Sequence, residues 1–235
     1  MKTIITHEYK INYEYELEEF VKKSTDYALS KRSELYNLFN CNENDIGSLT
    51  ASFFINRVSF VEYIKTLSKG KVPPEWATGC FYGGEIQVLV NVENKESKLK
   101  VLTHETIHLF FNKVIYNKYN IDRVNWLDEA FAVYLDGGKD DISNDELIEM
   151  ISSLDLVYED FDVNVLSNSN KIITKEYNGY DMFNIIGKYI FENNLEEEYL
   201  SLLINDRDEI IKRGKSILKV SIEYFKEKQK KFEKW

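Results

Sequence analysis

Proline, cysteine and histidine are scarce in this chain of 235 residues, which holds 2 Pro, 2 Cys and 3 His. With only 10 Gly as well, the composition is too poor in proline and glycine for a disordered or low-complexity linker. Hydrophobic residues make up 43% of the chain and aromatic residues 14%, enough for one substantial core or for one domain in two lobes. We therefore expect a folded globular protein.

Basic residues are outnumbered by acidic ones, 30 against 40, which gives a formal net charge of −10. Proteins bind phosphate backbones through clustered Lys and Arg, so nucleic acid is not an expected partner. The one basic run, residues 226–234, is typical of the solvated face of a terminal helix.

Long apolar segments are also missing. The sequence contains no stretch of about 18 apolar residues, the length needed to span a bilayer. Residues 1–15 lack the apolar region of a signal peptide. Cys41 and Cys80 have no second cysteine at metal-ligand spacing and suit free thiols in a reducing compartment. A cytoplasmic protein without a membrane span is the expectation, unless a leader has been removed.

Hydrophobic periodicity predicts a mixed first half and a mainly helical second half. Strands are expected at residues 3–15, 49–55 and 85–92. Helices are expected at residues 17–39, 58–67, 101–119, 126–136, 145–153, 180–193, 195–204 and 207–233. Because there is no repeat and no linker, we expect a single α+β domain over residues 1–235, with an α/β lobe at 1–118 and a mainly helical lobe at 119–235.

His104, Glu105 and His108 form an HExxH pattern. Residues i and i+4 share one face of a helix, so the two imidazoles can converge on one cation. Glu105 is rotated by about 100° from His104, where it can remove a proton from a water held by that cation. The alternative is a chance histidine pair, but the flanking residues are apolar and would bury it without partners at a cost of several kcal/mol.

A catalytic zinc ion usually has three protein ligands and one open position. The remaining histidine, His7, lies in a predicted strand with no motif around it, so a downstream carboxylate is required. The missing third histidine also excludes the HExxHxxGxxH type. Glu129 is the candidate, because it stands inside an otherwise apolar helix.

Asp136 follows Glu129 by seven residues, two helical turns on and on the same face. It could accept the second ring N–H of a ligating histidine and so fix the orientation of that ring. Asp128 is rotated to another face of the helix. A solvent-facing carboxylate at the helix end is the alternative for Asp136.

The segments HETIH and WLDEAFAVYLD resemble the gluzincin metallopeptidases in a minimal, minigluzincin-like form. In that family an HExxH helix is joined by a glutamate from a second helix, and the second segment is similar to the WLNEGFAxYLE-like stretch of aminopeptidase-N-type enzymes. The resemblance covers residues 101–136, with Asp128 for the usual Asn and Ala130 for the usual Gly. It implies one Zn²⁺ per chain, bound by His104, His108 and Glu129, with Glu105 as the general base.

The resemblance also implies a thermolysin-like fold, in which a small mixed or mostly antiparallel sheet and the zinc helix precede a helical lobe. A tyrosine on a later helix would stabilise the oxyanion, and Tyr180 fits that position better than Tyr177. The strand that begins at Gly83 and Gly84 would be the edge strand that pairs with extended substrate, with the glycines permitting close approach. Residues 83–87 are only weakly similar to the GxMEN segment of aminopeptidases, because its Met-Glu-Asn core is missing.

These residues predict a zinc-dependent hydrolase that cleaves the peptide bonds of peptide or protein substrates. One alternative is a zinc-stabilised binding or regulatory module without turnover, against which the intact Glu105 argues. A second is a zinc hydrolase of a non-peptide amide or ester, because the same attack by water serves both.

Overall fold

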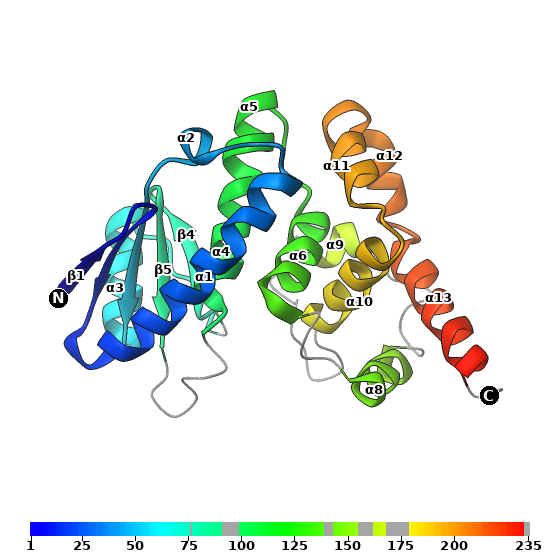
Figure 1. Cartoon of the computed structure of the whole chain (residues 1–235), viewed down its shortest axis with the longest axis horizontal. Coiled ribbons are helices and arrows are strands. Elements are labelled where there is room, and N and C mark those ends of the chain that lie inside the picture. The colour runs from blue at the N-terminus through cyan, green and yellow to red at the C-terminus, as the bar shows by residue number, and fades with distance from the viewer. Residues whose placement is uncertain (76, 91–98, 139–142, 155–161, 168–178, 233–235) are drawn as a thin grey trace. The chain divides into compact units, whose positions relative to one another are not determined.

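The computed structural model describes residues 1–75, 77–90, 99–138, 143–154, 162–167 and 179–232 (Figure 1). The chain divides into two compact units, Met1–Lys118 and Tyr119–Trp235. The first unit holds a five-stranded sheet with helices, and the described part of the second consists of helices and their connections. The expected α+β fold class is therefore confirmed.

The sheet is mixed. Its strands are β1 (Lys2–Ile5), β2 (Tyr9–Tyr13), β3 (Leu49–Phe54), β4 (Gly79–Tyr82) and β5 (Glu85–Leu89), in the spatial order β1-β2-β3-β5-β4. The outer pairs, β1–β2 and β4–β5, are antiparallel, whereas β2–β3 and β3–β5 are parallel. The sheet is therefore mixed as expected, with as many parallel as antiparallel pairs.

The single strand predicted over residues 3–15 is instead a hairpin of two strands. Its turn is set by Thr6, whose hydroxyl accepts hydrogen bonds from the backbone N–H groups of Glu8, at 3.3 Å, and Tyr9, at 2.9 Å. A hydroxyl that bonds its own backbone offers the chain an alternative to continuing the strand. Alternation of apolar residues runs through the turn and hides it from a reading of periodicity alone.

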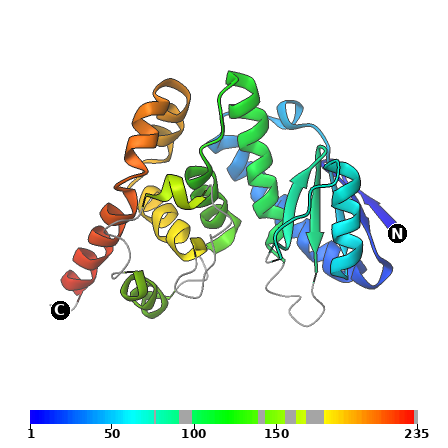
Figure 2. The same cartoon turned by 180° about the vertical axis from the view of Figure 1, so that it is seen from behind.

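The helices of the first unit cover both faces of the sheet. They are η1 (Tyr15–Leu17), α1 (Glu18–Leu38), α2 (Glu43–Ile46), α3 (Arg57–Leu67), α4 (Val101–Phe110), the π-helix η4 (Phe111–Tyr116) and α5 (Asn117–Tyr119). Figures 1 and 2 show α1 and α4 on one face of the sheet and α3 on the other. The predicted helix at residues 101–119 is confirmed as one continuous helical segment made of α4, η4 and α5.

The second unit is built around the packing of α6 against α10. Its helices are α6 (Asn125–Val133), the π-helix η5 (Tyr134–Gly138), α8 (Asn144–Leu154), α9 (Val163–Ser167), α10 (Gly179–Glu192), α11 (Glu196–Asn205), α12 (Arg207–Arg213) and α13 (Ile217–Phe232). The helix predicted over residues 207–233 is two helices, because the chain turns at Gly214, which lies directly against the side chain of Asn164. The predicted turn at Asn193–Asn194 is confirmed, whereas the one at 167–170 falls largely outside the described residues. No described helix has the length and apolar composition that crossing a bilayer requires.

Candidate metal centre

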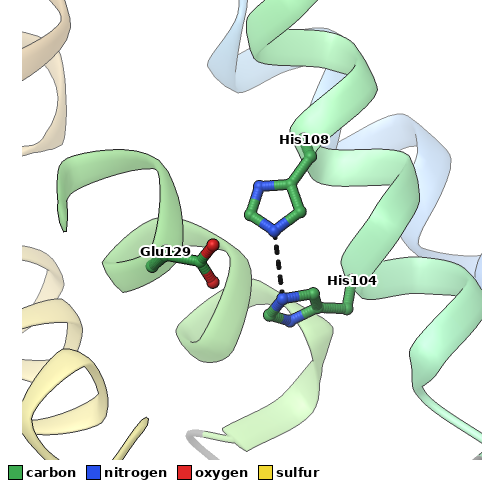
Figure 3. Close-up of side chains that lie close together, drawn as sticks. All are labelled: His104, His108 and Glu129. Carbon is green, nitrogen blue, oxygen red and sulfur yellow. Dashed lines mark hydrogen bonds between the residues drawn. The ribbon is translucent and has the colours of Figure 1, made fainter. Parts of the chain in front are cut away.

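The helix α4 carries the HExxH residues with its apolar faces buried. Leu102, Ile107 and Phe110 are each 0% exposed, whereas His104 and His108 are partly exposed on a shared face. Their Nε2 atoms are 3.1 Å apart and their rings are almost perpendicular, with centroids 4.7 Å apart at an angle of 85° (Figure 3). The i, i+4 spacing therefore brings the two imidazoles together as predicted.

A buried hydroxyl pair connects α4 to the sheet. The hydroxyls of Tyr9 and Thr106 are 3.0 Å apart, and the Thr106 hydroxyl donates at 2.7 Å to the backbone carbonyl of Leu102. Because the single proton of Thr106 is used in that bond, the Tyr9 hydroxyl is the donor between them. Tyr9 is 0% exposed, so this bond fixes α4 against β2 in a setting without water.

A buried arginine lies between α1, β2 and the C-terminal end of α4. Arg32, on α1, forms an ion pair with Glu8, which also accepts a hydrogen bond from the Tyr36 hydroxyl at 2.8 Å. The guanidinium lies over the rings of Tyr9, Tyr36 and Phe110, at 5.2, 5.4 and 5.0 Å from their centroids. This position lets a cation that is 97% buried interact with three π faces beside its carboxylate.

Glu105 lies against the backbone of β4. A Cβ atom built on Gly79 would overlap with Oε1 of Glu105 and would come within 2.8 Å of Cγ1 of Val101. The lack of a side chain at Gly79 therefore makes the space that the Glu105 carboxylate occupies. Glu105 is 8% exposed, so little of its side chain faces solvent, and the backbone of β4 bounds the space that its carboxylate occupies.

Glu129 stands on α6, among residues that are buried. Trp126, Leu127 and Ala130 are each 0% exposed, and the Glu129 side chain is 15% exposed. The ligand atoms of His104, His108 and Glu129 all lie within 4.8 Å of one another, and Figure 3 shows the carboxylate pointing toward the imidazole pair. Within the described residues, no other group of three or more His, Cys, Asp or Glu side chains is arranged to hold a metal ion.

The donor set fits a metal ion. Zinc binds imidazole nitrogens at about 2.0–2.1 Å in a tetrahedron, which places two donors roughly 3.3 Å apart. The Nε2 atoms of His104 and His108 are 3.1 Å apart, close to that separation. Two nitrogens and a carboxylate oxygen can therefore hold a metal ion here, and the ligand type suits zinc among other transition metals.

Arg123 is a residue of this region that sequence reasoning missed. Its Nε donates to Oδ2 of Asp128 at 2.5 Å, and its Nη2 lies 3.5 Å from Oε1 of Glu129. Asp128 is only 1% exposed, so this ion pair lies at a buried carboxylate next to the candidate ligand. The available signal was Asp128 itself, because an aspartate in an apolar helix requires a cation or donors.

The two residues predicted to assist the centre lie in different helices. Asp136 lies in η5, whose wider π turn rotates less per residue than the α-helix assumed in placing it seven residues after Glu129. Tyr180 lies in the first turn of α10, with its ring edge-on to Phe183 at 6.3 Å. The roles of both remain predictions, and Tyr177 lies outside the described residues.

The glycine pair expected to bind substrate forms a turn. Gly83 and Gly84 make the two-residue loop between β4 and β5, with φ of +62° and +83°. Tight hairpins favour positive φ at both positions, which glycine adopts without strain. The predicted edge strand at 85–92 is corrected too, because β5 pairs on both sides and β4 is the edge; substrate binding at the glycines remains a prediction.

His7, Cys41 and Cys80 are the remaining histidine and the two cysteines of the chain. The His7 side chain is 73% exposed, with Nε2 3.5 Å from Glu43, as expected for a surface histidine. Burial, with the charge of Glu105 adding to it, raises the pKa of the Cys80 thiol to about 12. Burial and Asp45 raise the pKa of Cys41 to about 11. Both thiols therefore stay protonated near neutral pH, where a nucleophile or ligand would need the thiolate.

Neither a protein-family model nor a curated protein matches this chain.

Proposed function

We propose that the protein is a zinc-dependent peptidase, with His104, His108 and Glu129 as the metal ligands. The observation that carries the proposal is the proximity of these three ligand atoms, all within 4.8 Å of one another. The HExxH spacing and the resemblance of residues 101–136 to gluzincin metallopeptidases support it. The thermolysin-like arrangement implied by that resemblance belongs to the same proposal.

The chain's own residues would divide the work of hydrolysis as follows. His104, His108 and Glu129 would hold a zinc ion, which would supply Lewis acidity to activate water and polarise a carbonyl. The Glu105 carboxylate takes the proton from the attacking water and passes it to the leaving amine nitrogen. The Tyr180 hydroxyl donates a hydrogen bond to the oxygen on which negative charge develops.

The position of Glu105 favours an enzyme over a metal-stabilised binding module. A module needs only the three ligands, whereas this chain keeps position 79 free of a side chain where a Cβ would collide with the Glu105 carboxylate. A buried carboxylate beside two candidate ligands is expected to have a chemical task, because its burial carries a desolvation cost. Hydrolysis of a non-peptide amide or ester would use the same residues and is distinguished by substrate.

Metal analysis of the purified protein tests the ligand set. We expect one zinc per chain in the wild type and loss of most of it in His108→Ala and Glu129→Ala. Two matched controls should keep their zinc: His7→Ala, which removes the exposed histidine, and Glu149→Ala, which removes an exposed helical glutamate. Zinc retention in both ligand variants would overturn the proposed centre.

A digest of a peptide library tests the reaction. We expect cleavage by the wild type, inhibition by a zinc chelator, and a loss of turnover in Glu105→Gln without loss of zinc. Amide and ester substrates assayed in parallel distinguish the non-peptide alternative. Peptide cleavage that persists unchanged in Glu105→Gln would refute the general-base role.

A further inference from the structure

Position 128 is where this chain departs in charge from the gluzincin pattern that it resembles, with Asp in place of the usual Asn. The Asp128 side chain is 1% exposed and lies one residue before the candidate ligand Glu129. Two adjacent carboxylates, one of them buried, repel each other and carry a desolvation cost. A compensating cation is therefore expected close by.

Arg123 is placed to serve both carboxylates. Its Nε donates to Asp128 Oδ2 at 2.5 Å, and its Nη2 reaches to 3.5 Å from Glu129 Oε1. The planar guanidinium presents its donors in a fixed fork, so binding Asp128 also determines where the second arm points. The shorter contact is with Asp128, so most of the charge of Arg123 is matched there and not at Glu129.

We propose that Arg123 is a positioning residue for the metal ligand: it neutralises buried Asp128 and orients Glu129 through Oε1 without cancelling its charge. The proposal rests on the zinc site proposed above. Asp128 and Arg123 then depend on each other. Without Arg123 the buried Asp128 strains the start of α6, and without Asp128 the arginine turns its full charge on Glu129 and competes with the cation.

The test is a double-mutant cycle read as zinc dissociation constants, measured by competition with a chromophoric chelator. Removing the partner of a ligand typically weakens metal binding by about 10–100-fold, and we expect Arg123→Gln and Asp128→Asn each to lose about 10-fold or more. The double variant, which restores the Asn of the family pattern, should bind within about threefold of the wild type, because each change removes the group that the other leaves unmatched.

Arg207→Gln is the matched control, because Arg207 is 40% exposed, against 44% for Arg123, and pairs with Asp122 at 3.7 Å. We expect it to bind zinc as the wild type does. Arg123→Lys keeps the charge but not the fork, and its dissociation constant should fall between those of the wild type and Arg123→Gln.

The outcomes separate the two proposals. A wild type that binds no zinc refutes the proposed function itself. A wild type that binds zinc, with an unchanged constant in Arg123→Gln or with losses that simply add in the double variant, overturns the role of Arg123. A lower thermal midpoint of the metal-free protein with an unchanged constant likewise shows a structural role only. If Arg123→Gln does not fold, an unchanged constant in Asp128→Asn overturns it.

Discussion

The two helices that carry the candidate ligands are held in different ways. Helix α4 is held by buried apolar packing and by the buried hydroxyl pair of Tyr9 and Thr106, and the guanidinium of Arg32 lies over the ring of Phe110 at its C-terminal end. Helix α6 meets α10 at close range, and its first turn carries the Arg123–Asp128 ion pair. Each helix thus combines close packing with a nearby ion pair, but the cation beside α4 is 97% buried, whereas Arg123 beside α6 is 44% exposed.

This difference explains why the two halves of the centre place different demands on the chain. The histidine pair needs only one helix, because i and i+4 share a face wherever α4 is placed. Glu129 comes from a second helix, which packs within its own unit against α10. Substitutions around α4 should therefore change the stability of the first unit or the position of Glu105, and those around α6 should change its packing against α10 or the orientation of Glu129.

The largest loss of stability is expected from Arg32→Met. The change leaves Glu8 without its buried cation, and breaking a buried ion pair from one side costs about 3–5 kcal/mol. Urea unfolding measures the loss, and adding Glu8→Gln should recover part of it. Lys2→Met, which breaks the exposed Lys2–Glu18 pair, should leave the free energy of unfolding nearly unchanged. Equal losses in Arg32→Met and Lys2→Met would contradict the importance of the buried ion pair.

Gly79→Ala should act on the reaction and not on the metal. The new methyl group would displace the Glu105 carboxylate, and a misplacement of about 1 Å can lower turnover by about 100-fold. Peptide turnover and zinc content are measured on the same preparation. Cys80→Ala is the control, because Cys80 packs toward Phe54 and Phe60 on the α3 side of the sheet. Wild-type turnover in Gly79→Ala would show that the Glu105 carboxylate can shift without loss of its proposed role.

Gly187→Ala tests the packing of α6. A Cβ at Gly187 would overlap with the backbone carbonyl oxygen of Ala130 and lie 3.0 Å from Cβ of Tyr134, so α6 and α10 would have to separate. Overpacking of this kind costs about 1–3 kcal/mol. In a free helix, alanine would instead be favoured over glycine by about 1 kcal/mol. Because the obstacle is backbone, we expect a net loss of up to about 2 kcal/mol. Urea unfolding measures it, with Lys188→Ala, the next residue on the same helix, as the control.

The smallest effect is expected from Tyr9→Phe. The change removes one buried hydrogen bond but leaves the Thr106 hydroxyl bonded to Leu102, so we expect a loss of about 1 kcal/mol. Tyr15→Phe, at a residue that is 65% exposed, should be neutral in the same unfolding assay. A loss above that of Gly187→Ala would show that the hydroxyl pair stabilises the protein more than the close contact between α6 and α10 does.

Sequence reasoning succeeded where the signal is local. The helix at 101–119 and the converging histidines follow from spacing, and Glu129 was singled out because a carboxylate is costly in an apolar helix. The missed features are non-local. Strand β4 is four residues long with little alternation, and the roles of Gly79 and Arg123 depend on which segments meet them in space. The broken helix at Gly214 likewise reflects its contact with Asn164.

Because Gly79 and Glu105 are in close contact, the residue types at these two positions should depend on each other among related proteins. A methyl group at the first and a carboxylate at the second compete for one volume, so substitutions at the two sites should occur together among proteins of this fold. A homologue that keeps both histidines but carries alanine at the position of Gly79 should have lost the acidic residue or its use. Under the proposed function, such a homologue would bind the metal ion without cleaving peptides.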